Sequence, residues 1–135
     1  MKRFKQILIY LAGVSFSLNL LSGYLHFFHS DHGRWTLKEN ERKNKIKYAK
    51  QVKRGKILFD RRLCADCHGG GGKKPVYEFY PKLYGQNVEY LVNQMKDIQS
   101  GIRNNGMSSA MAPALDDLNE NDLRAIALYL SGEFK

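Results

Sequence analysis

Hydrophobic residues follow three different patterns along this chain of 135 residues. From Ile7 to Phe28, 22 consecutive residues carry no formal charge. Residues 31–63 are mostly polar, with only a weak apolar stripe at helical spacing. The remaining half contains two stripes with the three- and four-residue spacing of amphipathic helices, and no alternation typical of a strand. These stripes are Leu91, Met95 and Ile98, then Leu123, Ile126, Ala127 and Leu130. The pattern therefore predicts an all-α chain.

The N-terminal apolar run predicts a membrane segment. As a helix rising 1.5 Å per residue it would extend about 33 Å, enough to cross a bilayer core. The alternative is a cleaved secretory signal, with its apolar core at residues 7–14 and a poor cleavage site at Ser15-Phe16-Ser17. The apolar run continues well past that site, so we expect residues 1–30 to form an uncleaved anchor. Either interpretation sends the rest of the chain across the membrane.

Four helices are expected after the anchor. Thr36 with Glu39 matches a capping box, which predicts a linker helix beginning near Leu37 within residues 31–48. The next helix should cover Ala49 to Arg62, with Gly55 where another helix crosses closely. A middle helix should begin near Asn87 and end at Gly101, a suitable C′ residue. The last should begin at an Asn119 N-cap, with Leu118 and Leu123 as a hydrophobic staple and with Tyr129 or its neighbours meeting Gly55.

Charge is distributed unevenly along the chain. Residues 31–63 hold twelve Lys and Arg against four Asp and Glu, a net +8, whereas residues 64–135 hold seven against nine, a net −2. A nucleic-acid-binding domain would carry its positive charge on the folded domain, so nucleic acid is not an expected partner. The basic linker is expected to be a solvated spacer, or to rest on anionic headgroups or an acidic partner.

The two cysteines of the chain lie in one motif, Cys64-Ala65-Asp66-Cys67-His68. A zinc site would need a second pair of ligands, and no cysteine or histidine follows His68. A thioredoxin-type dithiol would need a βαβ context, which the pattern does not show. Covalent attachment of a c-type haem uses both thiols and the adjacent imidazole at this spacing.

Basic residues flank both ends of the apolar run, and by the positive-inside rule alone residues 31–63 would be cytoplasmic. Haem attachment occurs outside the cytoplasmic membrane, which places residues 31–135 outside.

An iron atom bound by His68 needs a sixth ligand, and methionine is the best candidate type in the remaining sequence. Met95 falls on a helical stripe and is expected in the core. Met107 and Met111 lie in a segment with Gly106 and Pro113, which reads as a loop that can aim a side chain at a ligand site. Spacing alone does not separate Met107 from Met111.

From about Val52 to its end, the chain resembles the small bacterial class I cytochromes c. The matching segments are GKILF, CADCHG, YPKLYGQNVEYLVNQMKDIQSGIR, MAPAL and LNENDLRAIALYL. The resemblance implies three main helices around one covalent haem c, attached at Cys64 and Cys67. It implies iron ligation by His68 and by Met111, seven residues before Leu118, with Met107 as runner-up. It also implies that the Pro81 carbonyl accepts from His68 and that Leu83 packs on the haem. One departure is that Phe59 stands five residues before Cys64 rather than four, which leaves the end of the first helix in doubt.

Together these features predict an anchor at residues 1–30, a basic linker at 31–48 and a cytochrome c domain at 49–135. We expect an electron-transfer protein rather than an enzyme, attached to the cytoplasmic membrane with its haem domain on the periplasmic side. Its expected partners are a quinol-oxidising complex and a terminal reductase or oxidase. The alternative is a haem-based ligand sensor or peroxidase-like enzyme with a labile sixth site. His26, His29 and His32 are weaker candidates for a second haem or a metal.

Overall fold

The computed structural model describes residues 34–133, and these residues form helices and turns without a strand. The chain divides into two compact units, Met1–Asn44 and Lys45–Lys135, which are described separately. Within residues 34–133, no helix combines the length and the hydrophobicity needed to cross a bilayer. The predicted anchor at residues 1–30, and His26, His29 and His32 with it, lie outside the described residues.

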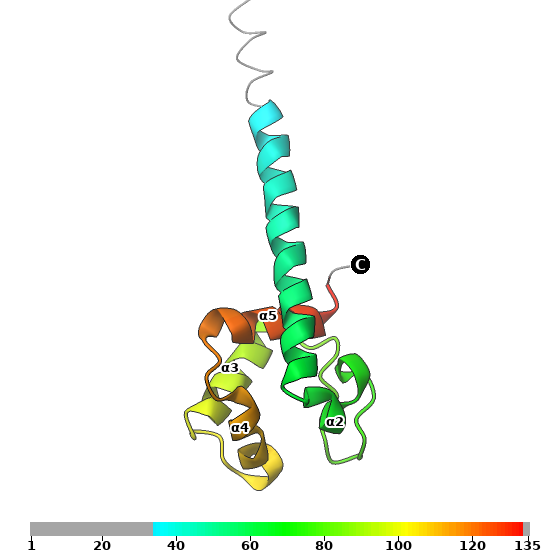
Figure 1. Cartoon of the computed structure of the whole chain (residues 1–135), viewed down its shortest axis with the longest axis vertical. Helices are drawn as coiled ribbons and strands as arrows, with labels where there is room; N and C mark the ends of the chain where they lie inside the picture. Colours follow the sequence, from blue (N-terminus) through cyan, green and yellow to red (C-terminus); the bar gives the residue numbers. More distant parts are fainter. Residues whose placement is uncertain (1–33, 134–135) are drawn as a thin grey trace, which may run out of the picture. The chain divides into compact units, whose positions relative to one another are not determined.

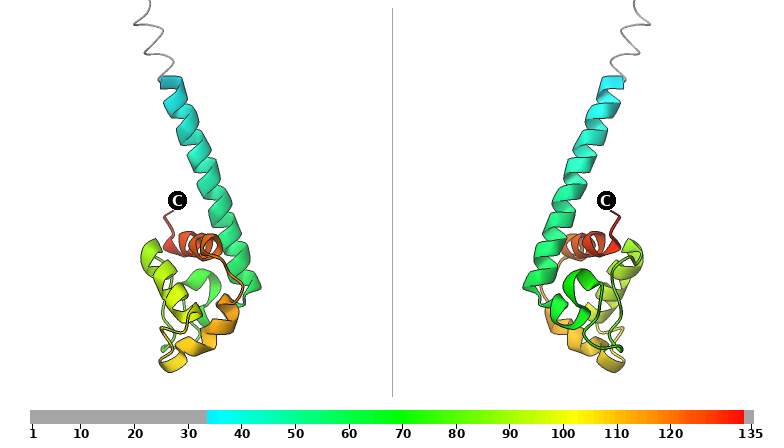
Figure 2. Two further views of the ribbon diagram at one scale, coloured as in Figure 1. Left: turned by 90° about the vertical axis from the view of Figure 1, so that its left-hand side faces the viewer. Right: turned by 90° about the vertical axis from the view of Figure 1, so that its right-hand side faces the viewer.

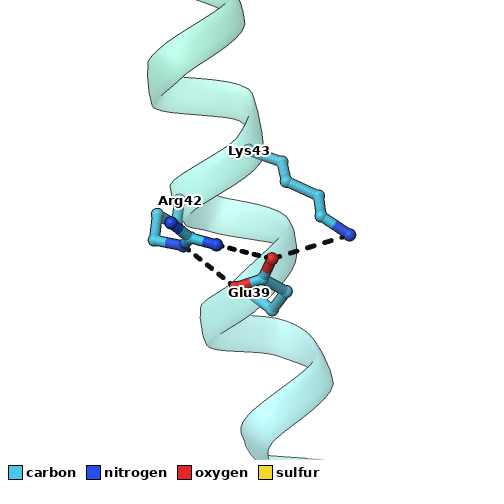
Figure 3. Close-up of polar contacts among 3 residues, drawn as sticks. All are labelled: Glu39, Arg42 and Lys43. Atoms are coloured by element: carbon cyan, nitrogen blue, oxygen red, sulfur yellow. Dashed lines mark hydrogen bonds and ion pairs between the residues drawn. The ribbon is translucent and has the colours of Figure 1, made fainter.

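The described part of the first unit is helical from residue 34 onward. The capping prediction is therefore wrong, because Thr36 lies inside the helix rather than at its start. The Glu39 carboxylate accepts from Arg42 Nε and Nη2 at 2.9 and 2.8 Å, and Lys43 Nζ lies 3.6 Å away (Figure 3). Ion pairs between residues three or four positions apart stabilise a helix locally, whether or not a capping residue is present.

In the second unit, helical structure continues through residues 45–61. It passes residue 49 without a break, so residues 45–48 of the predicted linker belong to the same helix as the predicted first helix, and the domain boundary at 49 stays a prediction. The last helix, α5 (Glu120–Ser131), crosses it (Figure 1). At the crossing, a Cβ added to Gly55 would lie 1.9 Å from the carbonyl oxygen of Ala125. The close crossing is confirmed, but its contact falls at Ala125, one helical turn before the predicted Tyr129.

The first helix ends at residue 61, close to the predicted Arg62, and the turn that follows explains the extra residue noted before Cys64. Leu63 adopts a left-handed conformation, with φ 57° and ψ 25°, and α2 (Cys64–His68) begins directly after it. Phe59 is fully buried. This left-handed residue separates the first helix from α2, and Phe59 is in the core although it is one residue farther from Cys64 than expected.

The glycine-rich segment Gly69–Lys74 follows α2. It forms a short 3-10 turn, η1 (Gly70–Gly72), and Gly72 is buried. The carbonyl oxygen of Gly72 accepts from the backbone N–H groups of Leu83 and Tyr84, both at 2.9 Å. A Cβ at Gly72 would lie 2.8 Å from Leu130 and 2.9 Å from Leu83. Glycine is therefore required here by packing as well as by its positive φ.

The two predicted amphipathic helices form the centre of the second unit. In α3 (Val88–Gln99), the side chain of Asn87 accepts from Tyr90 N, and Gly101 with φ 77° follows the C-cap, as predicted. In α5, Asn119 caps by accepting from Asp122 N at 3.1 Å, also as predicted. The stripe Leu123, Ile126, Ala127 and Leu130 is at most 2% exposed. These two helices contact one another and bury the shared core (Figure 1).

The segment between α3 and α5 was expected to be a loop. It instead contains the 3-10 helix η2 (Gly106–Met111) and a short helix, α4 (Ala112–Leu115), in which Pro113 occupies one of the first positions. Proline is tolerated there because the N–H it lacks has no intrahelical partner. Both α2, in green, and the yellow segment that follows α3 lie on the same side of α5 (Figure 2).

Candidate functional site

A cavity of about 330 Å³ lies in the second unit, between α2, α3 and η2. Most of its wall is apolar, and its side chains also come from α5 and from the segment between η1 and α3. The wall includes Phe59, Cys64, Cys67, His68, Phe79, Tyr80, Pro81, Leu83, Leu91, Met95, Ile98, Arg103, Met107, Met111, Ile126 and Leu130. The structure therefore brings all seven residues predicted for the haem site to one cavity: Cys64, Cys67, His68, Pro81, Leu83, Met107 and Met111.

The short helix α2 positions the two thiols and the imidazole. Cys64 and Cys67 are three residues apart and so lie on one face of the helix. His68 ends the helix and is only 4% exposed, and its Nδ1 donates to the carbonyl oxygen of Pro81 at 3.0 Å. A carbonyl can only accept, so this contact places the ring proton on Nδ1 and the lone pair on Nε2. His68 is thus oriented as a metal-ligating imidazole with a backbone partner.

The Cys64 thiol is poorly suited to redox or nucleophilic chemistry of its own. Burial raises the pKa of the Cys64 thiol to about 11, so Cys64 is protonated at neutral pH. Reactive dithiols have the opposite character, with at least one thiol pKa lowered by a helix N-terminus or a nearby positive charge. A hydrogen bond with Cys67 raises the pKa of Tyr80, which places the Tyr80 hydroxyl at the second thiol. The environment of Cys64 is therefore unlike that of a reactive dithiol.

The two candidate methionines differ in burial. Both line the cavity, but Met107 is 56% exposed, whereas Met111 is half-buried and packs against the core cluster. The difference follows from η2: Met111 ends it beside α4, whereas Met107 lies near its exposed beginning. Met95 is 7% exposed and belongs to the core as predicted, although it also forms part of the cavity wall.

Some polar side chains at the cavity edge form hydrogen bonds with other groups of the protein. Gln86 Nε2 donates to the carbonyl oxygen of Lys82. Arg103 Nη1 donates to Gln94 Oε1, and both residues line the cavity. Gln94 was not anticipated, because a polar residue on a helix gives no signal of the cavity it faces.

Two aromatic rings of the cavity wall, Phe79 and Tyr80, were also missed. Their ring centroids lie 4.6 Å apart, and Tyr80 lies 6.2 Å from the His68 ring. Phe79 is 66% exposed and stacks on Tyr77, with ring planes 4° apart. The aromatic-rich stretch from Tyr77 to Tyr80 was the available signal, but its meaning depends on a cavity that only the folded chain forms.

These residues fit a covalently held porphyrin better than a bare metal ion. The site offers two thiols on one helix face, one oriented imidazole and thioether sulfurs, around a mostly apolar cavity. Thioether and imidazole nitrogen are axial ligands of haem iron in cytochromes c. The apolar wall suits a flat macrocycle, which contributes buried area that so short a chain lacks.

Comparison with known proteins gives consistent matches. Residues 50–130, more than half of the chain, match the family described as cytochrome C oxidase, cbb3-type, subunit III. Cytochrome c-554(548) of Halomonas halodenitrificans is 36% identical over 72 residues, which cover 52% of this chain and 83% of that protein.

Two longer relatives match over a smaller share of their length. Cytochrome c4 of Pseudomonas aeruginosa is 39% identical over 71 residues, covering 53% of this chain and 33% of the relative. The thiosulfate dehydrogenase electron acceptor of Thiomonas intermedia is 37% identical over 68 residues, covering 50% of this chain and 30% of the relative. The matched part of this chain thus spans about a third of these two proteins.

Proposed function

Because this chain belongs to the cytochrome c family and carries one covalently bound haem c, we propose that it is a membrane-anchored carrier of single electrons between respiratory partners. The haem supplies one-electron iron chemistry, and the protein binds, insulates and tunes it. The observation that carries the proposal is the His68–Pro81 hydrogen bond at 3.0 Å in a cavity that Cys64 and Cys67 also line.

We assign the haem contacts to five residues. Cys64 and Cys67 form the thioether bonds, and His68 binds the iron through Nε2. The Pro81 carbonyl keeps the proton on Nδ1, which fixes the ring orientation and raises the basicity of Nε2. Leu83, half-buried against the core, packs on the macrocycle.

Met111 is the proposed second axial ligand. Its half-buried side chain is held between the cavity and the core, whereas Met107 exposes more than half of its surface. A side chain already restricted by packing loses less conformational entropy when it binds a metal. Thioether ligation fills the sixth position and raises the reduction potential, which suits a carrier and disfavours a ligand sensor or peroxidase.

Partners are proposed to approach at an aromatic patch, defined as Val76, Tyr77 and Phe79. All three residues are more than half exposed, and Phe79 also lines the cavity. Exposed apolar groups of this kind mark interaction sites, and aromatic residues are enriched in the centres of interfaces. The patch thus gives a redox partner close access to the haem.

The anchor at residues 1–30 would hold the haem domain on the periplasmic side of the cytoplasmic membrane. A tether raises the effective concentration of a carrier near a membrane-bound partner. We propose a quinol-oxidising complex as donor and a terminal reductase or oxidase as acceptor, with the chain either as a tethered carrier or as a subunit of such a complex. The name of the Thiomonas relative, an electron acceptor of a dehydrogenase, supports a dedicated enzyme partner as well.

Two spectroscopic measurements on the full chain test this proposal. Haem colour that stays with the denatured protein after acid–acetone extraction shows the covalent bonds, and loss of colour contradicts them. The visible spectrum of the reduced protein should change little on adding carbon monoxide at neutral pH, because both axial positions are filled. A large change would instead support the sensor or peroxidase-like alternative.

A further inference from the structure

Residues 45–61 of the first helix present two different faces in the second unit. Gly55 and Phe59 are buried on the side that meets α5 and the core. Ile46, Lys50, Lys53 and Ile57 follow the spacing i, i+4, i+7 and i+11, which places them on one stripe of a helix. All four are exposed, Ile46 by 44% and Ile57 by 42%. We call these four residues the outer face.

The surroundings of the outer face are strongly basic. Residues 45–61 hold seven Lys and Arg against one acid, Asp60, a net +6: Lys45, Lys47, Lys50, Lys53, Arg54, Lys56 and Arg61. Arg54 is paired with the buried Asp122, and Lys56 with Asp60. Lys45, Lys47, Lys50 and Lys53 form no ion pair with another described residue. Their charge is therefore available to an external anionic partner.

The residue types distinguish between the possible partners. Protein interfaces are enriched in Arg and aromatic residues and depleted in Lys, whereas four of the five bases in residues 45–61 that lack an ion pair with another described residue are Lys, Arg61 being the fifth. Helices that lie in a membrane interface combine apolar side chains with lysines, whose long stems lie along the apolar zone while their charges reach the headgroups. Two isoleucines separated by two lysines on a convex helix surface fit that arrangement. We propose that the outer face of residues 45–61 binds an anionic phospholipid surface.

The described residues of the first unit have a similar composition. Trp35 and Leu37 are exposed, and Arg34 and Lys38 lie within four residues of Trp35. Tryptophan is enriched at membrane interfaces because its ring is apolar and its N–H is polar. These residues are consistent with lipid contact, but the proposal rests on residues 45–61 alone.

The lipid contact is separate from the haem site. None of the four outer-face residues lines the cavity, to which the first helix contributes Phe59. Binding through this face leaves the residues assigned to the haem unaffected. The inference can therefore fail while the electron-transfer proposal stands, and the converse also holds.

The test measures lysine protection in the full holoprotein assembled into lipid nanodiscs. Discs of phosphatidylcholine alone are compared with discs containing phosphatidylglycerol, and lysine acetylation at low reagent dose is read by mass spectrometry. We expect Lys50 and Lys53 to be acetylated about fivefold or more slowly in the anionic discs, from the gain per basic residue near such a surface. Raising the salt to about 1 M, where the Debye length falls to about 3 Å, should abolish the protection.

A double variant and a matched control distinguish the outer face from general charge. Lys50→Gln with Lys53→Gln should reduce the protection of Lys47 and Lys56. Lys74→Gln with Lys82→Gln removes the same charge elsewhere on the second unit and should leave that protection unchanged. Equal acetylation in both kinds of disc, or no association with either, overturns the proposal. Protection by polyglutamate but not by anionic discs also overturns it and assigns the face to an acidic protein.

Discussion

At the scale of single residues, burial separates side chains that the sequence leaves equivalent. Met107 and Met111 both lie in η2 and both reach the cavity, but only Met111 packs against the core. Leu63 is the contrasting case, because its hydrophobic side chain is 65% exposed and its backbone has a left-handed conformation. Each of these positions gives a direct test of the site.

Replacing Met111 by Ala should open the sixth position of the iron while the haem stays attached. We expect the reduction potential to fall by a sizeable part of the roughly 0.8 V range that axial ligands span. We also expect the iron to bind added carbon monoxide or imidazole. Potentiometry and a carbon monoxide difference spectrum measure both effects. Met107→Ala is the matched control and should change neither. If Met107→Ala has these effects and Met111→Ala does not, the ligand assignment is wrong.

Replacing Leu63 by Gly should stabilise the holoprotein. A left-handed conformation costs a residue with a side chain about 1–2 kcal/mol, and Gly adopts it without that cost. Little packing is lost because Leu63 is largely exposed. Part of this gain is offset because Gly has more conformational freedom in the unfolded chain. We therefore expect a net gain of up to about 1 kcal/mol in the free energy of unfolding, measured by denaturant titration. Ile57→Gly, in regular helix, should destabilise instead. A loss at Leu63→Gly would show that the leucine side chain itself is needed.

At the scale of elements, the second unit depends on the crossing between residues 45–61 and α5. Gly55 and Ala125 allow the two backbones to approach, and the Arg54–Asp122 pair joins the same elements, with Nε 2.7 Å from Oδ1. Two further pairs, Lys96–Glu120 and Glu89–Arg124, link α3 to α5. The latter pairs are exposed and contribute little, so the close crossing is the more important contact.

Gly55→Ala tests this crossing. Alanine favours a helix by about 1 kcal/mol over glycine, but its Cβ would lie 1.9 Å from the Ala125 carbonyl oxygen, so the backbones must separate. Overpacking of this kind costs about 1–3 kcal/mol, and we expect a net loss in the free energy of unfolding. Gly70→Ala is the control, because a Cβ there meets no atom within 4 Å, and it should be nearly neutral. A stabilised Gly55→Ala protein would contradict the crossing geometry.

At the scale of the whole second unit, two surfaces with different chemistry are present. The aromatic patch borders the cavity, whereas the outer face of residues 45–61 contributes nothing to its wall. An electron-transfer protein benefits from this separation, because membrane contact and partner contact use different residues. The patch is the proposed site of contact with a redox partner, and the outer face is the proposed site of contact with lipid.

Tyr77→Ser combined with Phe79→Ser should slow electron exchange without altering the haem. Truncating two central aromatic residues of an interface costs at least 1–2 kcal/mol, so we expect the self-exchange rate between oxidised and reduced holoprotein to fall about tenfold. Magnetic resonance line broadening of mixed redox samples measures this rate. Ile102→Ser, at a highly exposed isoleucine outside the cavity wall, is the control. An unchanged rate with an unchanged visible spectrum would remove the patch from the proposal.

The sequence alone determined the features that depend on neighbours within a few residues. The Asn87 and Asn119 caps, the buried stripes of α3 and α5, and the grouping of Cys64, Cys67 and His68 arise from helical spacing, which the chain encodes locally. The sequence also indicated a close helix crossing at Gly55, because glycine within a helix has a cost that packing must offset.

Tertiary structure decided the features that depend on distant segments meeting. It determined that Ala125 faces Gly55, that the glycine segment is a packed turn, that Phe79 and Tyr80 join the cavity wall, and that Met111 is better buried than Met107. It also extended the first helix through residue 49 and used Leu63 to absorb the extra residue before Cys64. The physical reason is that these outcomes minimise a shared packing energy among segments far apart in the chain, and no local pattern contains that information.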